Sequence, residues 1–187
     1  MDSDYLRWGR HDSFRPSWNE RTATLAGLIP EETNTLIEFG CGVGFLQECL
    51  PETIKYTGSD MVGRTPDTLV MDLNLQPYYH HDHYDVAFLS GVIEYVSHKK
   101  VPAFIDYLNK ISDVVIVSYS DMAYDKTVSK KEGWANWYNQ NQMIRLFTGR
   151  GFELDERLVW KTQKLYKFNK VKTTLRQTIT RIITPRE

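Results

Sequence analysis

The amino-acid sequence predicts one α/β domain built around a mostly parallel sheet. Segments with strand and helix patterns alternate along the chain, and parallel strands need such intervening helices to connect them. The fifth expected strand, residues 113–119, is the most apolar and fits a central position that is buried on both faces. The chain has 187 residues, which is enough for one domain with a proper core and hardly enough for two.

Short apolar runs bounded by acidic residues, serine or glycine mark the strands, and longer amphipathic stretches mark the helices. Strands are expected at residues 36–39, 54–60, 68–71, 84–90 and 113–119, and as a closing antiparallel pair at 152–160 and 163–169. Helices are expected at residues 44–50, 91–95, 100–111 and from about 136 to 149. Pro51 stops the first of these helices, because proline cannot continue one. A polar loop is expected between the fifth strand and the last helix.

Composition indicates an ordinary globular protein. Hydrophobic residues make up 41% and charged residues 25%, and the net charge of -1 gives no general reason to expect a nucleic-acid partner. No apolar run approaches the roughly 18 residues of a membrane-spanning helix, and the first residues do not resemble a signal peptide. Cys41 and Cys49 suggest neither a disulfide framework nor a zinc site, so the expected compartment is the reducing cytoplasm.

The run at residues 80–83, His-His-Asp-His, contains several potential metal ligands. These residues are consecutive and lie in a polar loop, so their side chains diverge instead of converging on one ion. No metal site is expected there.

The most informative segment is residues 36–46, Leu-Ile-Glu-Phe-Gly-Cys-Gly-Val-Gly-Phe-Leu. An apolar strand ends in this run and a helix begins, with three glycines at alternating positions. Glycine is needed where φ is positive or where a ligand contacts the backbone, and the helix start offers unpaired N–H groups. A tight turn without a ligand would need only one glycine. The segment therefore predicts a nucleotide-type cofactor loop.

The spacing of the glycines distinguishes between cofactors. The dinucleotide fingerprint G-x-G-x-x-G would require glycine at position 45, where phenylalanine stands, and this disfavours a nicotinamide oxidoreductase. A phosphate loop is excluded because no Gly-Lys-Ser/Thr follows. Glu38 followed by Gly40, Gly42 and Gly44 resembles motif I of class I S-adenosylmethionine-dependent methyltransferases.

This resemblance covers roughly residues 34–169 and implies a Rossmann-like three-layer sandwich. Its sheet would have seven mostly parallel strands and a C-terminal antiparallel hairpin. One departure is visible: only residues 61–67 separate the second and third strands, so the helix usually found there is expected to be absent or a single turn. Residues 1–169 are assigned to the methyltransferase domain, with residues 1–33 as an N-terminal lid or helix segment.

The resemblance also implies S-adenosylmethionine as the cofactor and a set of residues that bind it. These are Glu38, Gly40, Cys41, Gly42, Gly44, Asp60, Met61, Asp72, Leu73 and Ser90. Asp60 ends the second strand, where a carboxylate can accept both ribose hydroxyls; the alternative is a solvated turn aspartate. Asp72 and Leu73 match the position that meets adenine, and an Asx turn or helix cap is the alternative. Met61 would pack on the adenine face, and Glu38 would bind the amino group or brace the loop.

Few residues are candidates for catalysis. A sulfonium methyl group is already electrophilic, so the protein mainly has to align a nucleophile and exclude water. A base is needed only for a nucleophile that carries a proton, such as a sugar hydroxyl. The candidates are His98, Glu94 and His11, while Tyr95 stands where related sequences often have a histidine.

The methyl acceptor is expected to be a small molecule. The Asn/Asp-Pro-Pro-Tyr/Phe run of amino methyltransferases is absent, since residues 90–93 read Ser-Gly-Val-Ile. Aromatic residues and arginines in segment 5–18 suit a lid over an aromatic, sugar or phosphorylated ligand, and more aromatics follow at 119–138. Alternatively, both sets pack on the domain. O-methylation of a saccharide or similar metabolite is slightly favoured, and the alternative function is a catalytically silent S-adenosylmethionine-binding partner subunit.

Residues 170–187 predict a basic amphipathic helix. From Lys161 to Arg186 there are eight lysines or arginines and no acidic residue. The apolar residues that recur at helical spacing are Val171, Leu175, Ile179 and Ile182. Such a helix can contact an anionic membrane or an acidic protein partner, or it can pack on the domain with a solvated basic face.

Overall fold

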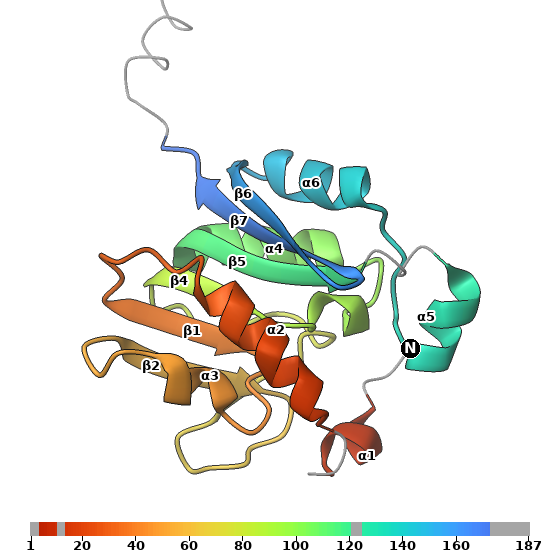
Figure 1. Cartoon of the computed structure of the whole chain (residues 1–187), viewed down its shortest axis with the longest axis horizontal. Helices are drawn as coiled ribbons and strands as arrows, with labels where there is room; N and C mark the ends of the chain where they lie inside the picture. The colour runs from red at the N-terminus through yellow and green to blue at the C-terminus, as the bar shows by residue number, and fades with distance from the viewer. Residues whose placement is uncertain (1–3, 11–13, 121–124, 173–187) are drawn as a thin grey trace, which may run out of the picture.

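The computed structural model describes residues 4–10, 14–120 and 125–172. The strands in these residues are β1 (Thr35–Phe39), β2 (Lys55–Asp60), β3 (Leu69–Val70), β4 (Tyr84–Leu89), β5 (Ser112–Ser120), β6 (Phe152–Trp160) and β7 (Gln163–Lys170). They form one seven-stranded sheet in the order β3-β2-β1-β4-β5-β7-β6 (Figure 1). The first five strands are parallel, and β7 runs antiparallel to both β5 and β6. The predicted sheet with its C-terminal hairpin is confirmed.

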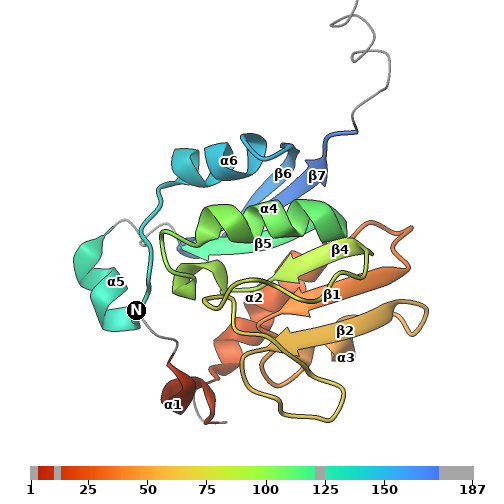
Figure 2. The ribbon, with the colours of Figure 1, turned by 180° about the vertical axis from the view of Figure 1, so that it is seen from behind.

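Helices cover both faces of the sheet. The helices are α1 (Tyr5–Trp8), α2 (Pro16–Ala26), α3 (Phe45–Cys49), α4 (Val101–Ile111), α5 (Lys126–Glu132) and α6 (Gln140–Thr148), with a 3-10 turn η2 (Ile93–Tyr95). Figures 1 and 2 show α2 and α3 on one face of the sheet and α4 on the other. The molecule therefore has the three layers that the sequence predicts.

Each face of the sheet has its own apolar core. On one face, strand residues pack with Leu25 of α2 and Leu46 of α3. On the other face, they pack with Phe104 of α4 and Phe147 of α6. Consecutive residues of β1 and β4 belong to opposite cores, as the two-residue period of a strand requires. The parallel strands end on the side of the sheet where α1 and α5 lie (Figure 1).

Some details differ from the sequence prediction. Helix α5 lies in the stretch that was predicted to be a polar loop. The prediction missed it because its sequence has almost no apolar periodicity and the helix depends on its N-cap. The carboxylate of Asp125 accepts hydrogen bonds from the backbone N–H groups of Thr127 and Val128. β3 has only two residues, fewer than the predicted 68–71. No helix is present between β2 and β3, and this was predicted.

The predicted basic helix at residues 170–187 lies almost entirely outside the described residues. Within the described ranges, no helix combines the length and the hydrophobicity needed to cross a bilayer.

Candidate functional site

The glycine loop joins β1 to α3 at the end of the parallel strands. Gly40, Gly42 and Gly44 have φ angles of 67°, 54° and 82°, a region that other residues rarely adopt. A Cβ atom on Gly40 would lie 2.4 Å from Val92, and one on Gly42 would lie 2.6 Å from Phe14. Gly44 is the N-cap residue of α3. The path of this loop therefore requires glycine at all three positions.

Asp60 connects the glycine loop to the neighbouring strand. It lies at the end of β2, and its carboxylate accepts hydrogen bonds from the backbone N–H groups of Gly42 at 2.9 Å and Val62 at 3.1 Å. Arg64 pairs with the same carboxylate at 3.2 Å and donates to the carbonyl of Trp8. Asp60 thus links the loop to the N-terminal segment through Arg64.

Glu38 is buried next to the loop, with 3% of its surface exposed. The hydroxyl of Tyr56 donates a hydrogen bond of 2.6 Å to its Oε2. Burial raises the pKa of Glu38 to about 8, so the carboxyl group is mostly protonated at neutral pH. Burial also raises the pKa of the Cys41 thiol to about 12, which leaves this cysteine as an unreactive neutral thiol.

Helix α2 places a buried arginine at the end of β4. Arg21 donates from Nε to the Ser90 hydroxyl at 3.0 Å and from Nη2 to the Ser90 carbonyl at 3.1 Å. The Thr22 hydroxyl lies 2.8 Å from the Ser90 hydroxyl. Gly91 leaves room for the guanidinium, because a Cβ atom there would lie 2.5 Å from Nη2. Burial lowers the pKa of Arg21, and the nearby Glu94 acts in the opposite direction.

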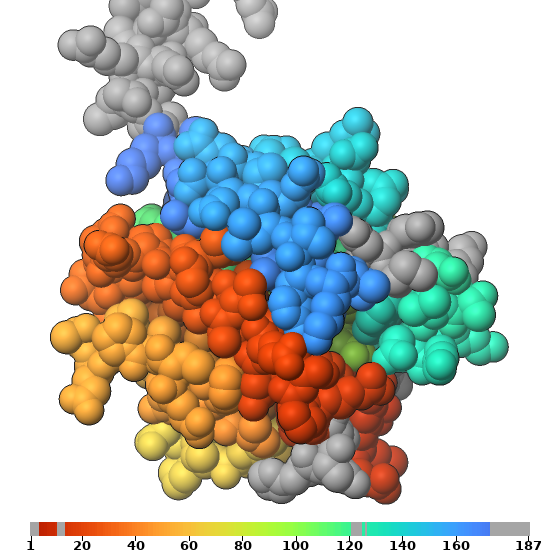
Figure 3. Space-filling view, in the orientation of Figure 1, coloured from red at the N-terminus to blue at the C-terminus, as the bar shows by residue number. Residues whose placement is uncertain are grey.

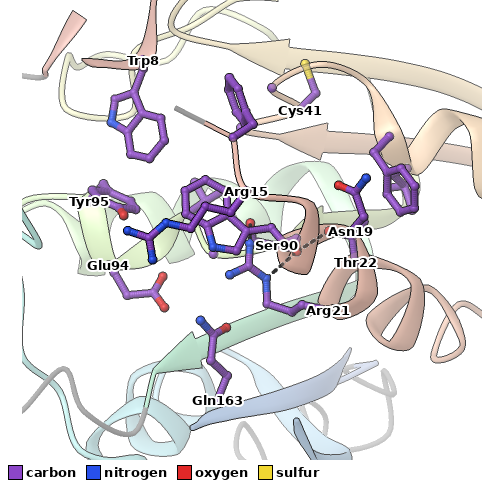
Figure 4. Close-up of a pocket in the computed structure, with 18 of the residues that line it drawn as sticks. Trp8, Arg15, Asn19, Arg21, Thr22, Cys41, Ser90, Glu94, Tyr95 and Gln163 are labelled. Atoms are coloured by element: carbon purple, nitrogen blue, oxygen red, sulfur yellow. Dashed lines mark hydrogen bonds between the residues drawn. The ribbon is translucent and has the colours of Figure 1, made fainter. Parts of the chain in front are cut away.

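A cavity of about 370 Å³ lies among these groups. Figure 4 shows Arg15, Arg21, Glu94 and Gln163 around it. Glu94 is 1% exposed, and its Oε1 accepts a hydrogen bond of 2.9 Å from the backbone N–H of Ser120. Its Oε2 is buried and has no hydrogen-bond partner among the described residues. Burial raises the pKa of Glu94. A buried carboxyl oxygen without a partner is available for a hydrogen bond with a ligand.

A second cavity, of about 390 Å³, adjoins the first. Residues that line both are Trp8, Met61, Val92 and Tyr95. Asp72 lines the second cavity and accepts hydrogen bonds of 2.8 Å from the Tyr5 hydroxyl and from the backbone N–H of Asn74. The N-terminal segment therefore contacts both predicted cofactor acids, Asp72 directly and Asp60 through Arg64.

The family model described as a methyltransferase domain matches residues 10–157, which include the glycine loop and most of both cavities. The chain belongs to this methyltransferase family. The family expected from the sequence is confirmed, and the expected cofactor, S-adenosylmethionine, agrees with it. No curated protein sequence matches the chain.

Solved methyltransferase structures share the fold of this domain at low sequence identity. The CcbJ methyltransferase from Streptomyces caelestis has a TM-score of 0.63 and 10% identity, over 90% of this chain and 95% of its own. The 1,6-didemethyltoxoflavin-N1-methyltransferase from Burkholderia thailandensis, solved with S-adenosylhomocysteine, has a TM-score of 0.63 and 11% identity, over 90% and 84%. Human N-acetylserotonin methyltransferase, solved with SAM, has a TM-score of 0.65 and 13% identity, over 89% and 56%.

The methyltransferase domain brings the predicted cofactor residues to the two cavities. The first is lined by Glu38, Gly40, Cys41, Gly42, Asp60, Met61 and Ser90. The second is lined by Met61, Asp72 and Leu73. Gly44 lines neither cavity and instead begins α3. Which of these residues bind the cofactor stays a prediction, and the two cavities supply its geometry.

Of the predicted catalytic candidates in the described residues, Glu94 lines a cavity and His98 does not. The His98 ring stacks on Trp137 at 5.0 Å and on Tyr138 at 4.4 Å between ring centres. The chain turns away after η2, and the backbone N–H of His98 donates to the carbonyl of Ala135. The third candidate, His11, falls outside the described residues.

The histidine run before β4 has local partners. His80 Nε2 lies 2.8 Å from the Tyr84 hydroxyl, and His83 lies 3.5 Å from Asp113. In the part of the chain that the structure describes, no three potential ligands gather around a common point where a metal ion could bind.

The aromatic residues expected to shape the substrate at 119–138 divide into anchoring residues and one residue of the first cavity. Asn136 is fully buried, and its amide donates to two carbonyls near η2, at 2.6 and 2.8 Å, while the Tyr119 hydroxyl donates to its Oδ1. The backbone N–H of Tyr138 donates to that hydroxyl at 2.8 Å. Among the described aromatic residues of this stretch, only Trp134 lines the first cavity. Tyr124 lies outside the described residues.

Arg21 and Thr22 were not predicted as site residues from the sequence. Arg21 stands three residues after Trp18 and four before Leu25, so it lies on the apolar stripe of α2. A charged residue on the buried side of a helix is uncommon and marks a specific contact. The position of Arg21 on this apolar stripe could therefore have identified it as a candidate site residue from the sequence.

Proposed function

We propose that this chain is an S-adenosylmethionine-dependent methyltransferase that methylates a hydroxyl group of a small molecule, with a saccharide or similar metabolite as the acceptor class. The observation that carries the proposal is the cavity between the glycine loop and Glu94. One side of it has a bare glycine backbone and two acidic residues at strand ends, and the other side has a buried carboxylate oxygen without a partner.

The residues present fit S-adenosylmethionine. At Gly40 and Gly42 a Cβ atom would collide with the side chains of Val92 and Phe14, so only glycine lets the loop follow this path along the wall of the cavity. Asp60 would hold the ribose, and Asp72 with Leu73 would meet the adenine from the second cavity. Arg21 would hold the carboxylate of the methionine part with the N–H groups that Ser90 does not use, because a guanidinium has five N–H donors and Ser90 accepts from only Nε and Nη2.

When bound, S-adenosylmethionine supplies an electrophilic methyl group, and the electron pair of the breaking C–S bond stays on sulfur as the acceptor oxygen takes the methyl. Glu94 Oε2 would accept the hydrogen bond of the acceptor hydroxyl and take its proton. Burial raises the pKa of Glu94, so its ionised carboxylate binds a proton more tightly than that of an exposed glutamate. Trp8, Tyr95 and Trp134 would exclude water from this part of the cavity.

The proposal is tested by the effect of S-adenosylhomocysteine on thermal unfolding. We expect this product analogue to raise the melting temperature and NAD to leave it unchanged. Asp60→Ala should weaken S-adenosylhomocysteine binding about 10- to 100-fold, because charged hydrogen bonds are lost. Asp67→Ala is the matched control, since Asp67 is an exposed acid in the same connection. Absence of any shift with S-adenosylhomocysteine would refute the proposal.

A second measurement separates the enzyme from a silent cofactor-binding subunit. Protein that binds S-adenosylhomocysteine is incubated with labelled S-adenosylmethionine and a panel of sugars, nucleotides and phenols. Transfer of label to an acceptor, reduced in Glu94→Gln, supports the enzyme. Binding without transfer to any acceptor supports the silent subunit.

A further inference from the structure

The first cavity has a side that the predicted cofactor residues do not form. Its walls come from the start of α2, from α5 and the loop after it, and from the turn between β6 and β7. Figure 3 shows the atoms of α2 beside those of the β6–β7 hairpin, and an ion pair of 2.9 Å between Glu20 and Lys161 joins the two. Glu94 lines the same cavity, so a ligand on this side can reach its carboxyl group.

The other arginine that lines this cavity and two arginines outside it already have partners. Arg21 is held by Ser90, and Arg64 is paired with Asp60. Arg7 donates to the carbonyl of Glu132 at 2.7 Å. In each case protein groups already hold the guanidinium in place.

Arg15 differs from these arginines. It lines the cavity, and its carbonyl accepts a hydrogen bond from the backbone N–H of Trp18, but its guanidinium has no hydrogen bond or ion pair with any residue that the structure describes. Figure 4 shows its guanidinium pointing into the cavity. Arg15 and Arg21 lie 5.7 and 5.8 Å from the centre of the Trp18 ring, so two positive charges share one indole. A cation placed in this way can bind an anionic group of a ligand without first breaking an ion pair.

Two acceptor atoms on the same side also have no partner. Glu94 Oε2 and Gln163 Oε1 are both buried without a hydrogen bond among the described residues, and both residues line the cavity. Buried polar atoms are nearly always hydrogen-bonded in folded proteins, so these two indicate a ligand that carries hydrogen-bond donors. The cavity therefore combines a free cation with two free acceptors.

We infer that the methyl acceptor is a hydroxylated anion, whose carboxylate or phosphate group binds Arg15 while its hydroxyl groups donate to Glu94 and Gln163. This inference rests on the proposed function and names the acceptor class of the same site. Arg15 acts as a specificity-determining residue. The donor side retains its own arginine, Arg21, so the two anionic groups do not compete for one guanidinium.

The first test uses inorganic phosphate as a probe of the Arg15 site. Protein saturated with S-adenosylhomocysteine, which would occupy Arg21, is titrated with phosphate and, at matched ionic strength, with chloride. We expect phosphate to raise the melting temperature further than chloride does, and the additional shift to disappear in Arg15→Gln. Arg145→Gln, which removes an exposed charge on α6, should keep it.

Equal shifts with phosphate and chloride, or the same additional shift in Arg15→Gln, would overturn the inference. Neither result concerns the cofactor, because the protein is already saturated with S-adenosylhomocysteine. A protein that S-adenosylhomocysteine does not stabilise would instead refute the proposed function. The affinity of Arg15→Gln for S-adenosylhomocysteine is measured in parallel and should match that of the wild type.

The second test compares acceptors in matched pairs that differ in one charged group. Glucuronate and glucose 6-phosphate are each compared with glucose, and 4-hydroxybenzoate with its methyl ester, by transfer of labelled methyl. We expect the anionic member to have the higher kcat/KM, and Arg15→Gln to lower that value about 10- to 100-fold, as expected for a lost charged hydrogen bond. The pair with the larger preference distinguishes carboxylate from phosphate. Preference for the neutral members would overturn the inference.

Discussion

Replacing Glu38 by glutamine should change how the stability of the protein depends on pH. The carboxyl group is fully buried, and burial raises its pKa from an ordinary value of 4.5 to about 8. Between these values the folded state holds a proton that the unfolded state has released. Stability is therefore greatest below the lower value and is lost as the pH rises towards 8, by up to about 1.4 kcal/mol per pH unit. From about pH 5 to 7.5, Glu38 alone would reduce the free energy of unfolding by up to about 3 kcal/mol.

Glutamine cannot titrate, and its amide oxygen can still accept the hydrogen bond from Tyr56. Glu38→Gln should therefore lose less stability than the wild type as the pH rises. The assay is urea unfolding of the ligand-free protein at several pH values in this window, with the exposed Glu31→Gln as the control. The control should follow the wild-type pH dependence. If the Glu38→Gln protein followed it as well, Glu38 would be ionised in the folded state and the reasoning would be refuted.

Three further predictions concern the glycine loop, the buried Asn136 and the exposed ion pair of Glu20 with Lys161. Gly42→Ala should cost about 1–2 kcal/mol of stability and weaken S-adenosylhomocysteine binding in calorimetry, because φ is 54° and the new Cβ meets Phe14; unchanged affinity would contradict this. Asn136→Ala should lower the free energy of unfolding by about 2–4 kcal/mol in urea, because it leaves buried carbonyls without partners. A decrease under about 1 kcal/mol would contradict the anchoring role of Asn136. Glu20→Gln should change stability by less than about 0.5 kcal/mol, since its pair with Lys161 is exposed.

Much of the fold could be predicted from the sequence, because its strands are short apolar runs with clear ends. The three glycines of the loop contributed most to the prediction, and each of them has a positive φ angle in the structure. Helix α5 escaped prediction because its sequence is polar and its stability depends on the cap at Asp125. Capping is a local contact of backbone and side chain, and a search for apolar periodicity does not detect it.

The site was predictable only where it follows the strand ends. Asp60, Asp72 and Ser90 lie beside the cavities because they end or follow parallel strands, and the strand order fixes which ends are neighbours. Arg21 lies on α2, 69 residues before its partner Ser90. Only the packing of α2 shows that Arg21 belongs to the site. His98 lies close to Glu94 in sequence but points elsewhere, because two rings of a later loop hold it.

The contact of Arg21 with Ser90 has a consequence for how this domain can be divided. The sheet and its glycine loop contain most of the expected donor site, so residues 34–169 would be the natural fragment to express or to graft onto another chain. That fragment would lack the guanidinium that fills the space above Gly91, and the end of β4 would then be left open to water. Helix α2 is thus an integral wall of the site and not an appendage, and a minimal domain has to begin before Pro16.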